Sequence, residues 1–165
     1  MSNKYEITDI AHPEFPNLRR IRALREIDFF EVLEGELGGY VESEANLSQE
    51  GECWVADDAC VYGNASVSGN AWAASRAQVY GNASVYDNAL VSGDATVSEN
   101  AQIFGNSWVY GNAVVRENAR VYENAWVFEF TEVSGNAWVY GDIRLKADSS
   151  EESVRTTEDA FKRAT

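Results

Sequence analysis

The residue types that most often carry chemistry are few in this chain, and they do not group. The single histidine, His12, is followed by Pro13 in a segment that reads as a loop, so we expect a solvated side chain. General-base catalysis and zinc hydration both need a group that titrates near neutrality or an imidazole ligand. The sequence therefore predicts no catalytic residue, no metal site and no cofactor.

The two cysteines fit no reactive pattern. Cys53 and Cys60 match neither a disulfide framework nor the spacing of zinc ligands. In the repeat described below, Cys53 falls on an inward position, where we expect inert packing. Cys60 is expected to point outward, with no histidine to activate it. The chain also has no P-loop, no dinucleotide-binding fingerprint and no Ser-His-Asp set, so we expect a protein that is not an enzyme.

Acidic residues outnumber basic ones by 27 to 13, and the formal net charge is −14. That charge disfavours direct binding to nucleic acid and favours solubility, and it leaves open a basic protein partner. Several acids recur at equivalent positions, so a calcium ion between Glu99 and Glu117 is an alternative to simple solvation. No apolar run is long enough to cross a membrane and no signal-peptide pattern is present, so we expect a cytoplasmic protein.

A six-residue repeat dominates the sequence, and its fold must position any functional side chain. It reads small–x–Val–x–polar–polar, and it runs without a gap for sixteen copies from Cys53 to Asp148. Two more copies, from Gly39 to Glu50, precede the two-residue insertion Gly51-Glu52. Side chains alternate along a strand, so the small residue and the Val share one face, which we expect to be the inner one. The Gly-Asn or acid-Asn pair then turns a corner, because Gly and Asn tolerate positive φ.

The iterated V-x-x-x-A-x pattern, with its variant V-Y-G-N-A-x, resembles the hexapeptide repeat of left-handed parallel β-helices. The variant looks like that of YdcK-like proteins and of many phage and prophage proteins of unknown role, and the resemblance covers roughly residues 4–148. The resemblance implies left-handed coils, a property that the spacing does not show. Acyltransferases and carbonic anhydrases of this fold act through histidines, and no coil position here holds one. The resemblance therefore implies the fold and not a transferase activity.

The fold class that we predict is all-β. Three copies of the six-residue repeat per turn give a single-stranded, left-handed parallel β-helix of about six triangular coils over residues 39–148. Residues 1–38 are predicted to form a small N-terminal β cap, with two strands in KYEITDI and LRRIRALREI that shield the open end of the helix. Residues 149–165 lose the period and are predicted to form a short C-terminal helix or tail.

One of the three outer faces should be strongly aromatic, because residues eighteen apart lie over one another. We call it the Trp face. A continuous apolar strip is unusual on a soluble monomer, and Trp and Tyr are enriched in interface cores. The alternative is that these side chains only cover their own sheet. The predicted interface comprises Trp54, Trp72, Leu90, Trp108, Tyr110, Trp126 and Phe128, with Arg76 and Phe130, which interrupt the Asp and Asn row at the adjoining corner.

These observations favour a non-enzymatic scaffold or binding protein of phage or prophage type that self-associates through the Trp face. A trimer or a dimer is expected, with a further protein as a possible partner and with no membrane or direct nucleic-acid contact. One alternative is an antagonist of a host defence system, acting as an acidic nucleic-acid mimic or by sequestering a small ligand. A second alternative is an acyltransferase that lacks the usual histidine.

Overall fold

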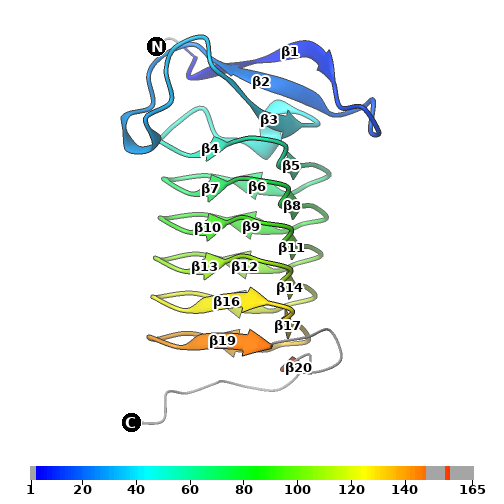
Figure 1. Ribbon diagram of the computed structural model, residues 1–165, viewed down its shortest axis with the longest axis vertical. Helices are drawn as coiled ribbons and strands as arrows, with labels where there is room; N and C mark the ends of the chain where they lie inside the picture. Colours follow the sequence, from blue (N-terminus) through cyan, green and yellow to red (C-terminus); the bar gives the residue numbers. More distant parts are fainter. Residues whose placement is uncertain (1–2, 148–154, 157–165) are drawn as a thin grey trace.

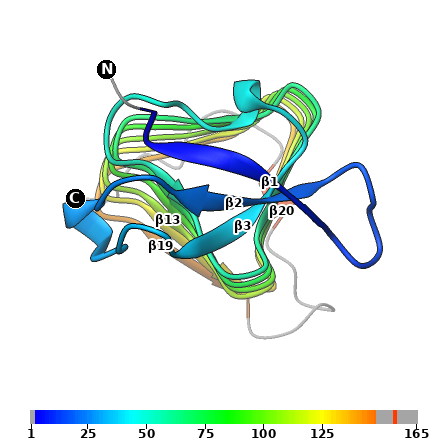
Figure 2. The same ribbon diagram turned by 90° about the horizontal axis from the view of Figure 1, so that it is seen from above.

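The computed structural model describes residues 3–147 and 155–156. The chain winds through stacked coils beneath a cap, and each coil passes once through each of three flat faces (Figure 1). Seen from the N-terminal end, the chain turns anticlockwise as it recedes, so the coils are left-handed (Figures 1 and 2). The prediction of an all-β fold with about six stacked parallel coils is confirmed.

The strands are short. In the described residues they form three sheets. The first sheet runs in the order β1 (Tyr5–Ala11), β2 (Arg19–Ala23), β3 (Leu37–Val41), β5 (Cys60–Val61), β8 (Gln78–Val79), β11 (Thr96–Val97), β14 (Val114–Val115), β17 (Glu132–Val133) and β20 (Arg155–Thr156). The second sheet contains β4 (Trp54–Val55), β7 (Trp72–Ala73), β10 (Leu90–Val91), β13 (Trp108–Val109), β16 (Trp126–Glu129) and β19 (Arg144–Ala147). The third contains β6 (Ser66–Val67), β9 (Ser84–Val85), β12 (Gln102–Ile103), β15 (Arg120–Val121) and β18 (Trp138–Val139).

The interior of the prism is filled by the small residue and the Val of each hexad, as the alternation predicts. Neighbouring coils pair in parallel with an offset of eighteen residues, for example Trp108 with Trp126. Where Ser107 replaces the small apolar residue, its hydroxyl donates to the Phe104 carbonyl at 2.7 Å, so its burial leaves no unpaired polar atom. The valines that we expected to face inward are all fully buried: Val61, Val67, Val79, Val85, Val91 and Val97.

The corners explain why Gly and Asn recur. The first corner residue adopts positive φ, 68° at Gly93, and glycine meets this requirement without a Cβ penalty. The following asparagines form ladders, in which the Asn82 amide donates to Asn100 at 3.1 Å and Asn100 donates to Asn118 at 3.2 Å. These ladders hold successive coils in register, as predicted.

The N-terminal cap is built as expected from two antiparallel strands, β1 and β2. Strand β2 pairs antiparallel with β3, and β3 pairs in parallel with β5, so the cap is continuous with the first face of the prism. Figure 2 shows these strands lying across the open end of the coils. The short 3-10 helix η1 (Asp28–Phe30) lies in the loop between β2 and β3, and η2 (Glu44–Asn46) leads into the first coil.

Most of the segment for which we predict a C-terminal helix or tail, residues 149–165, lies outside the described residues. Its described part is β20, which pairs in parallel with β17. Within the described residues, no helix has the length and apolar character needed to cross a bilayer.

Candidate interaction face

The Trp face is the outer surface of the second sheet, and its side chains stack in two rows. The Trp108 and Trp126 rings are parallel, with centroids 4.7 Å apart, and the two residues are register partners in adjacent coils. Tyr110 and Phe128 stack in the same way at 5.0 Å. The Arg144 guanidinium continues the first row, with its carbon 4.2 Å from the Trp126 ring centroid. A row of aromatic rings thus ends in a cation over the last ring.

The cap covers the N-terminal end of this face, which corrects our expectation for two residues. Trp54 is only 1% exposed and is one of the largest fully buried side chains. Trp72 is half-buried, and Phe30 of η1 packs against its ring with centroids 4.2 Å apart. The repeat period could not reveal this cover, because the covering loop belongs to the non-repetitive cap. The accessible strip therefore begins near Leu90.

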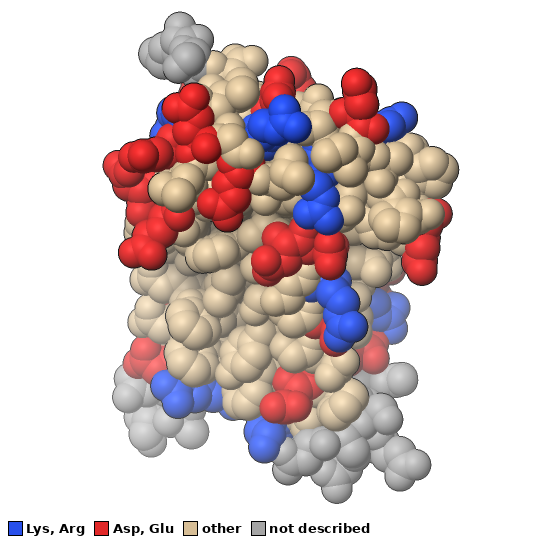
Figure 3. Space-filling model, turned by 45° about the horizontal axis from the view of Figure 1, so that its top comes forward, with Lys and Arg blue, Asp and Glu red and all other residues tan. Residues whose placement is uncertain are grey.

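The side chains that point out from the accessible strip are uncharged up to Arg144, although Glu129 lies at the corner between Phe128 and Phe130. Trp108 is 40% exposed and Phe130 is 37% exposed, whereas Leu90, Tyr110, Trp126 and Phe128 are half-buried. Figure 3 shows a largely uncharged surface below the cap, with acidic side chains gathered over the cap above it and both basic and acidic side chains near its lower end. The strip is thus an apolar surface between two charged ends.

Two residues, Arg76 and Phe130, interrupt the row of Asp and Asn at the corner that borders the strip. Arg76 is exposed and forms an ion pair with Asp94 at 2.7 Å, so it pairs with the next coil as the asparagine ladders do elsewhere. Arg76 therefore has a structural role at the corner. Phe130 has a large exposed apolar surface at the same corner.

A groove that the sequence did not reveal lies between the cap loop and the Trp face. Its volume is about 330 Å³, and Phe29 and Phe30 of η1 form one wall. Trp72, Leu90 and Trp108 form the other wall. The only sequence clue is the apolar pair Phe29-Phe30 in a turn, where apolar side chains are unexpected. The side chain of Phe29 is 59% exposed, so the loop presents an apolar tip beside the strip.

Aromatic stacking by itself does not distinguish the Trp face. On the third face, Tyr86, Phe104, Tyr122 and Tyr140 also stack, with successive centroids 4.9 to 5.2 Å apart. There the exposed Trp138 lies beside the guanidinium of Arg120, so charge interrupts that face. The Trp face differs in its long uncharged strip and in the apolar cap loop beside it.

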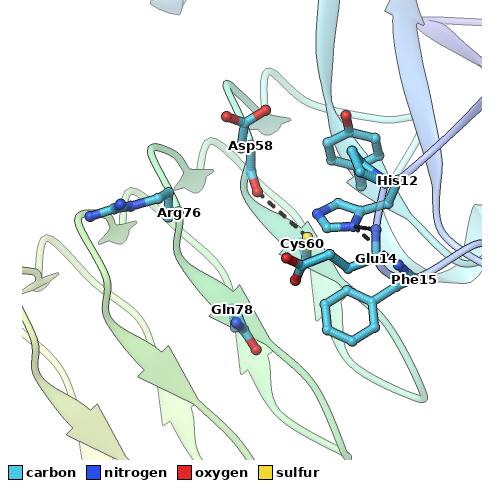
Figure 4. A pocket seen from close by; sticks show the side chains of 9 residues that line it. His12, Glu14, Phe15, Asp58, Cys60, Arg76 and Gln78 are labelled. Carbon is cyan, nitrogen blue, oxygen red and sulfur yellow. Dashed lines mark hydrogen bonds between the residues drawn. The ribbon is translucent and has the colours of Figure 1, made fainter.

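A second concave site corrects our expectation for His12 and Cys60. Both residues line a cleft of about 330 Å³ between the β1–β2 connection and the coils, together with Tyr40, Asp58 and Arg76 (Figure 4). Cys60 is 5% exposed, because the cap packs over its outward position. His12 is only partly exposed and lies edge-on to the Tyr40 ring, at 4.6 Å between centroids. We had expected a solvated His12 and an outward Cys60 with no histidine near it.

The geometry of this cleft does not favour a cysteine–histidine pair. His12 Nδ1 accepts hydrogen bonds from the backbone N–H groups of Glu14 and Phe15, at 3.1 and 3.2 Å. In the neutral imidazole, Nε2 then carries the proton and cannot act as a base. Burial raises the pKa of the Cys60 thiol to about 11, so the sulfur is protonated near neutrality and is a weak nucleophile.

The acidic corner residues bond to the backbone of the next coil. The carboxylates of Asp87 and Glu117 accept hydrogen bonds from the N–H groups of Gly105 and Gly135, at 3.1 and 2.7 Å. The bond of Glu117 explains one of the two acids between which the sequence allows a calcium ion, and the bond of Asp87 explains an acid at another corner. Across residues 3–147, no group of three or more His, Cys, Asp or Glu side chains is placed to hold a metal ion.

Comparison with known protein families agrees with this architecture. The family model described as the YdcK beta solenoid repeat matches residues 77–92 and 83–99, both within the coils. A search of curated proteins found no match. The matched repeat and the stacked parallel coils together show a β-solenoid built from repeats of the YdcK type.

Proposed function

We propose that this protein is a non-enzymatic scaffold or binding protein, of the phage or prophage type suggested by its repeat, that self-associates through the Trp face. The observation that carries the proposal is the uncharged aromatic strip from Leu90 to Phe130, with Trp108 40% exposed at its centre. Contiguous exposed apolar surface of this kind is typical of interaction sites. Large aromatic side chains at the centre of such a surface commonly contribute most of the binding energy.

The charges at the two ends of the strip favour a second copy of the chain as the occupant. The cap loop presents the exposed carboxylates of Asp28, Glu31 and Glu34 at one end, and the exposed Arg144 lies at the other. A two-fold axis across the strip, between β10 and β13, would set Arg144 of each copy against the acidic loop of the other. A parallel pair would instead place like charges at the same end. We therefore favour an antiparallel dimer over the trimer.

The size of the face shows why the cap loop should take part. The four accessible coils, from β10 to β19, are about 4.8 Å apart, and with a side of about five residues they give a flat area of roughly 300 Å². This is less than half of what one partner contributes to a standard interface. The exposed apolar tip of the loop, Phe29 and Leu33, extends the contact beyond the strip. The screening length at physiological ionic strength is about 8 Å, so the remaining negative charge opposes the contact only weakly.

Two features support the proposal that the chain is not an enzyme. The cysteine of the cleft is protonated near neutrality, and the histidine beside it uses Nδ1 to hold its own loop. A general base would need a ring nitrogen that is free to accept a proton, and an activated cysteine would need to be a thiolate.

A matched pair of tryptophan variants tests the proposal. Trp108 on the Trp face and Trp138 on the third face are 40% and 43% exposed, so either can be replaced by Glu without opening the core. Light scattering at tens of micromolar protein should give a dimer for the wild type and for Trp138→Glu, and a monomer for Trp108→Glu. Circular dichroism should show the same β content in all three proteins. A monomeric wild type would contradict self-association.

A further inference from the structure

A buried amine and a buried thiol are in contact at the N-terminal end of the coils. Lys4 Nζ lies 3.1 Å from Cys53 Sγ, and both residues are 0% exposed. Lys4 directly precedes β1 in the cap, whereas Cys53 occupies the inward position that follows the insertion Gly51-Glu52. The contact therefore joins the residue that precedes β1 to the first residue of the sixteen uninterrupted repeats.

The carbonyl groups near Cys53 account for the burial of the lysine but not for the thiol beside it. The ammonium donates to the carbonyl of Cys53 at 2.8 Å, and to those of Glu50 and Gly51 at 3.3 and 3.4 Å. A buried ammonium needs such partners, since an unpaired one is very costly. The inward position would accept Ala, as most other hexads show, but here it places a sulfur in reach of the amine nitrogen.

We propose that Lys4 and Cys53 form a peroxide-sensitive cross-linking site, in which oxidation joins the sulfur to the lysine nitrogen as a sulfenamide. The oxidant is hydrogen peroxide. In the first step the Cys53 sulfur attacks one peroxide oxygen, the S–O bond forms and the O–O bond breaks, giving a sulfenic acid. In the second step the Lys4 nitrogen attacks this sulfur, the S–N bond forms, and the S–O bond breaks to release water.

The pair also supplies the protons that these steps need. In the thiolate–ammonium form of the pair, the ammonium protonates the hydroxide that leaves in the first step, giving water and a free amine. That amine is the nucleophile of the second step, and its own proton leaves with the second water molecule. One peroxide is consumed and two waters are formed for each bond. Burial lowers the pKa of Lys4, which assists the loss of its proton.

The bond would act as a latch between the cap and the coils. It would close a loop over residues 4–53 that contains the strands β1, β2 and β3. A covalent closure of this length restricts the unfolded chain and should raise the Tm by several degrees. Cleavage of the S–N bond by an added thiol would release the latch.

The test uses the Cys60→Ser protein, so that no disulfide within the chain can form. After treatment with hydrogen peroxide, intact mass should fall by two hydrogen atoms, and proteolysis should yield one cross-linked peptide that contains residues 4 and 53. Dithiothreitol should restore the original mass and the original Tm. Lys4→Met and Cys53→Ala, each added to this background, are the controls and should not lose two hydrogens.

Two results would overturn the proposal. One is a gain of oxygen at Cys53 with Lys4 unmodified. The other is an unchanged mass at peroxide concentrations that oxidise the thiol of a small reference compound. Circular dichroism of the two control variants shows whether they keep the fold. The cross-link in the Cys60→Ser protein is read directly by mass in either case.

Discussion

At the residue scale, the corner positions show how a repeat tolerates strained residues. Corners that lack glycine place other residues at positive φ, for example 58° at Glu99 and 61° at Glu117. Such a conformation costs a non-glycine residue about 1–2 kcal/mol. At Glu117 the carboxylate offsets part of this cost by accepting the Gly135 N–H at 2.7 Å. Among the described residues, the Glu99 side chain has no such hydrogen bond.

The first prediction compares these two corners. Glu99→Gly should stabilise the protein by about 0.5–1 kcal/mol, because it removes the strain and loses no hydrogen bond. Glu117→Gly should gain less, since it also removes the bond to Gly135. Urea denaturation monitored by circular dichroism measures both changes. A larger gain for Glu117→Gly than for Glu99→Gly would show that the carboxylate bond contributes nothing.

The second prediction concerns Cys60 and alkaline pH. Burial, reinforced by the Asp58 carboxylate, raises the pKa of the thiol from 9.0 to about 11. A pKa raised in the folded state contributes stability in full below pH 9, and that stability is lost as the pH rises from 9 towards 11. Over this range the wild type should lose about 2–3 kcal/mol more than Cys60→Ser, as measured by urea denaturation. Equal losses in the two proteins would contradict the assignment.

At the element scale, a two-residue strand is stable only because of its neighbours. Val79 of β8 pairs with Val61 above it and Val97 below it, and all three are fully buried. Its neighbour Gln78 points outward and is half-buried. Because the period within a strand is two, a shift of register by one residue would exchange these environments.

The third prediction uses this alternation. Val79→Asp should cost several kcal/mol of unfolding free energy, because it buries a carboxylate that has no partner. Gln78→Asp adds the same side chain one position earlier and should change stability by less than about 1 kcal/mol. Thermal melts followed by circular dichroism separate the two outcomes. Similar melting temperatures for both variants would mean that the register is wrong.

At the scale of the whole molecule, the cap decides how much of the Trp face is available. It buries Trp54, it places Phe30 over Trp72, and it adds an acidic loop with an apolar tip beside the strip. The proposed antiparallel dimer depends on the contrast between this loop and Arg144 at the opposite end.

The fourth prediction is a charge exchange between the two ends. Arg144→Glu should weaken dimerisation about tenfold, because both copies of the contact become repulsive. Glu31→Arg should weaken it similarly, and the double variant should recover most of the affinity. Sedimentation equilibrium gives the three dissociation constants. A wild-type dimer whose double variant shows no recovery would exclude the antiparallel orientation but not self-association.

The coils could be predicted from the repeat alone, because a strict six-residue period leaves little choice about which side chains face inward. The buried Val79, the Asn82–Asn100–Asn118 ladder and the stacking of Trp108 on Trp126 all follow from local alternation and an eighteen-residue offset. These properties depend on residues that are close in the chain or related by the repeat, so they could be predicted without a structure.

The surfaces that the non-repetitive cap covers could not be predicted from the repeat and became visible only in the folded molecule. The burial of Trp54, the groove beside Phe29, the shared cleft of His12 and Cys60, and the contact of Lys4 with Cys53 all join the cap to the coils. The path of the cap has no period, and its contacts depend on how β2 and β3 direct the loops over the first coils. The repeat fixes the shape of the prism, whereas the cap determines which parts of its surface remain accessible.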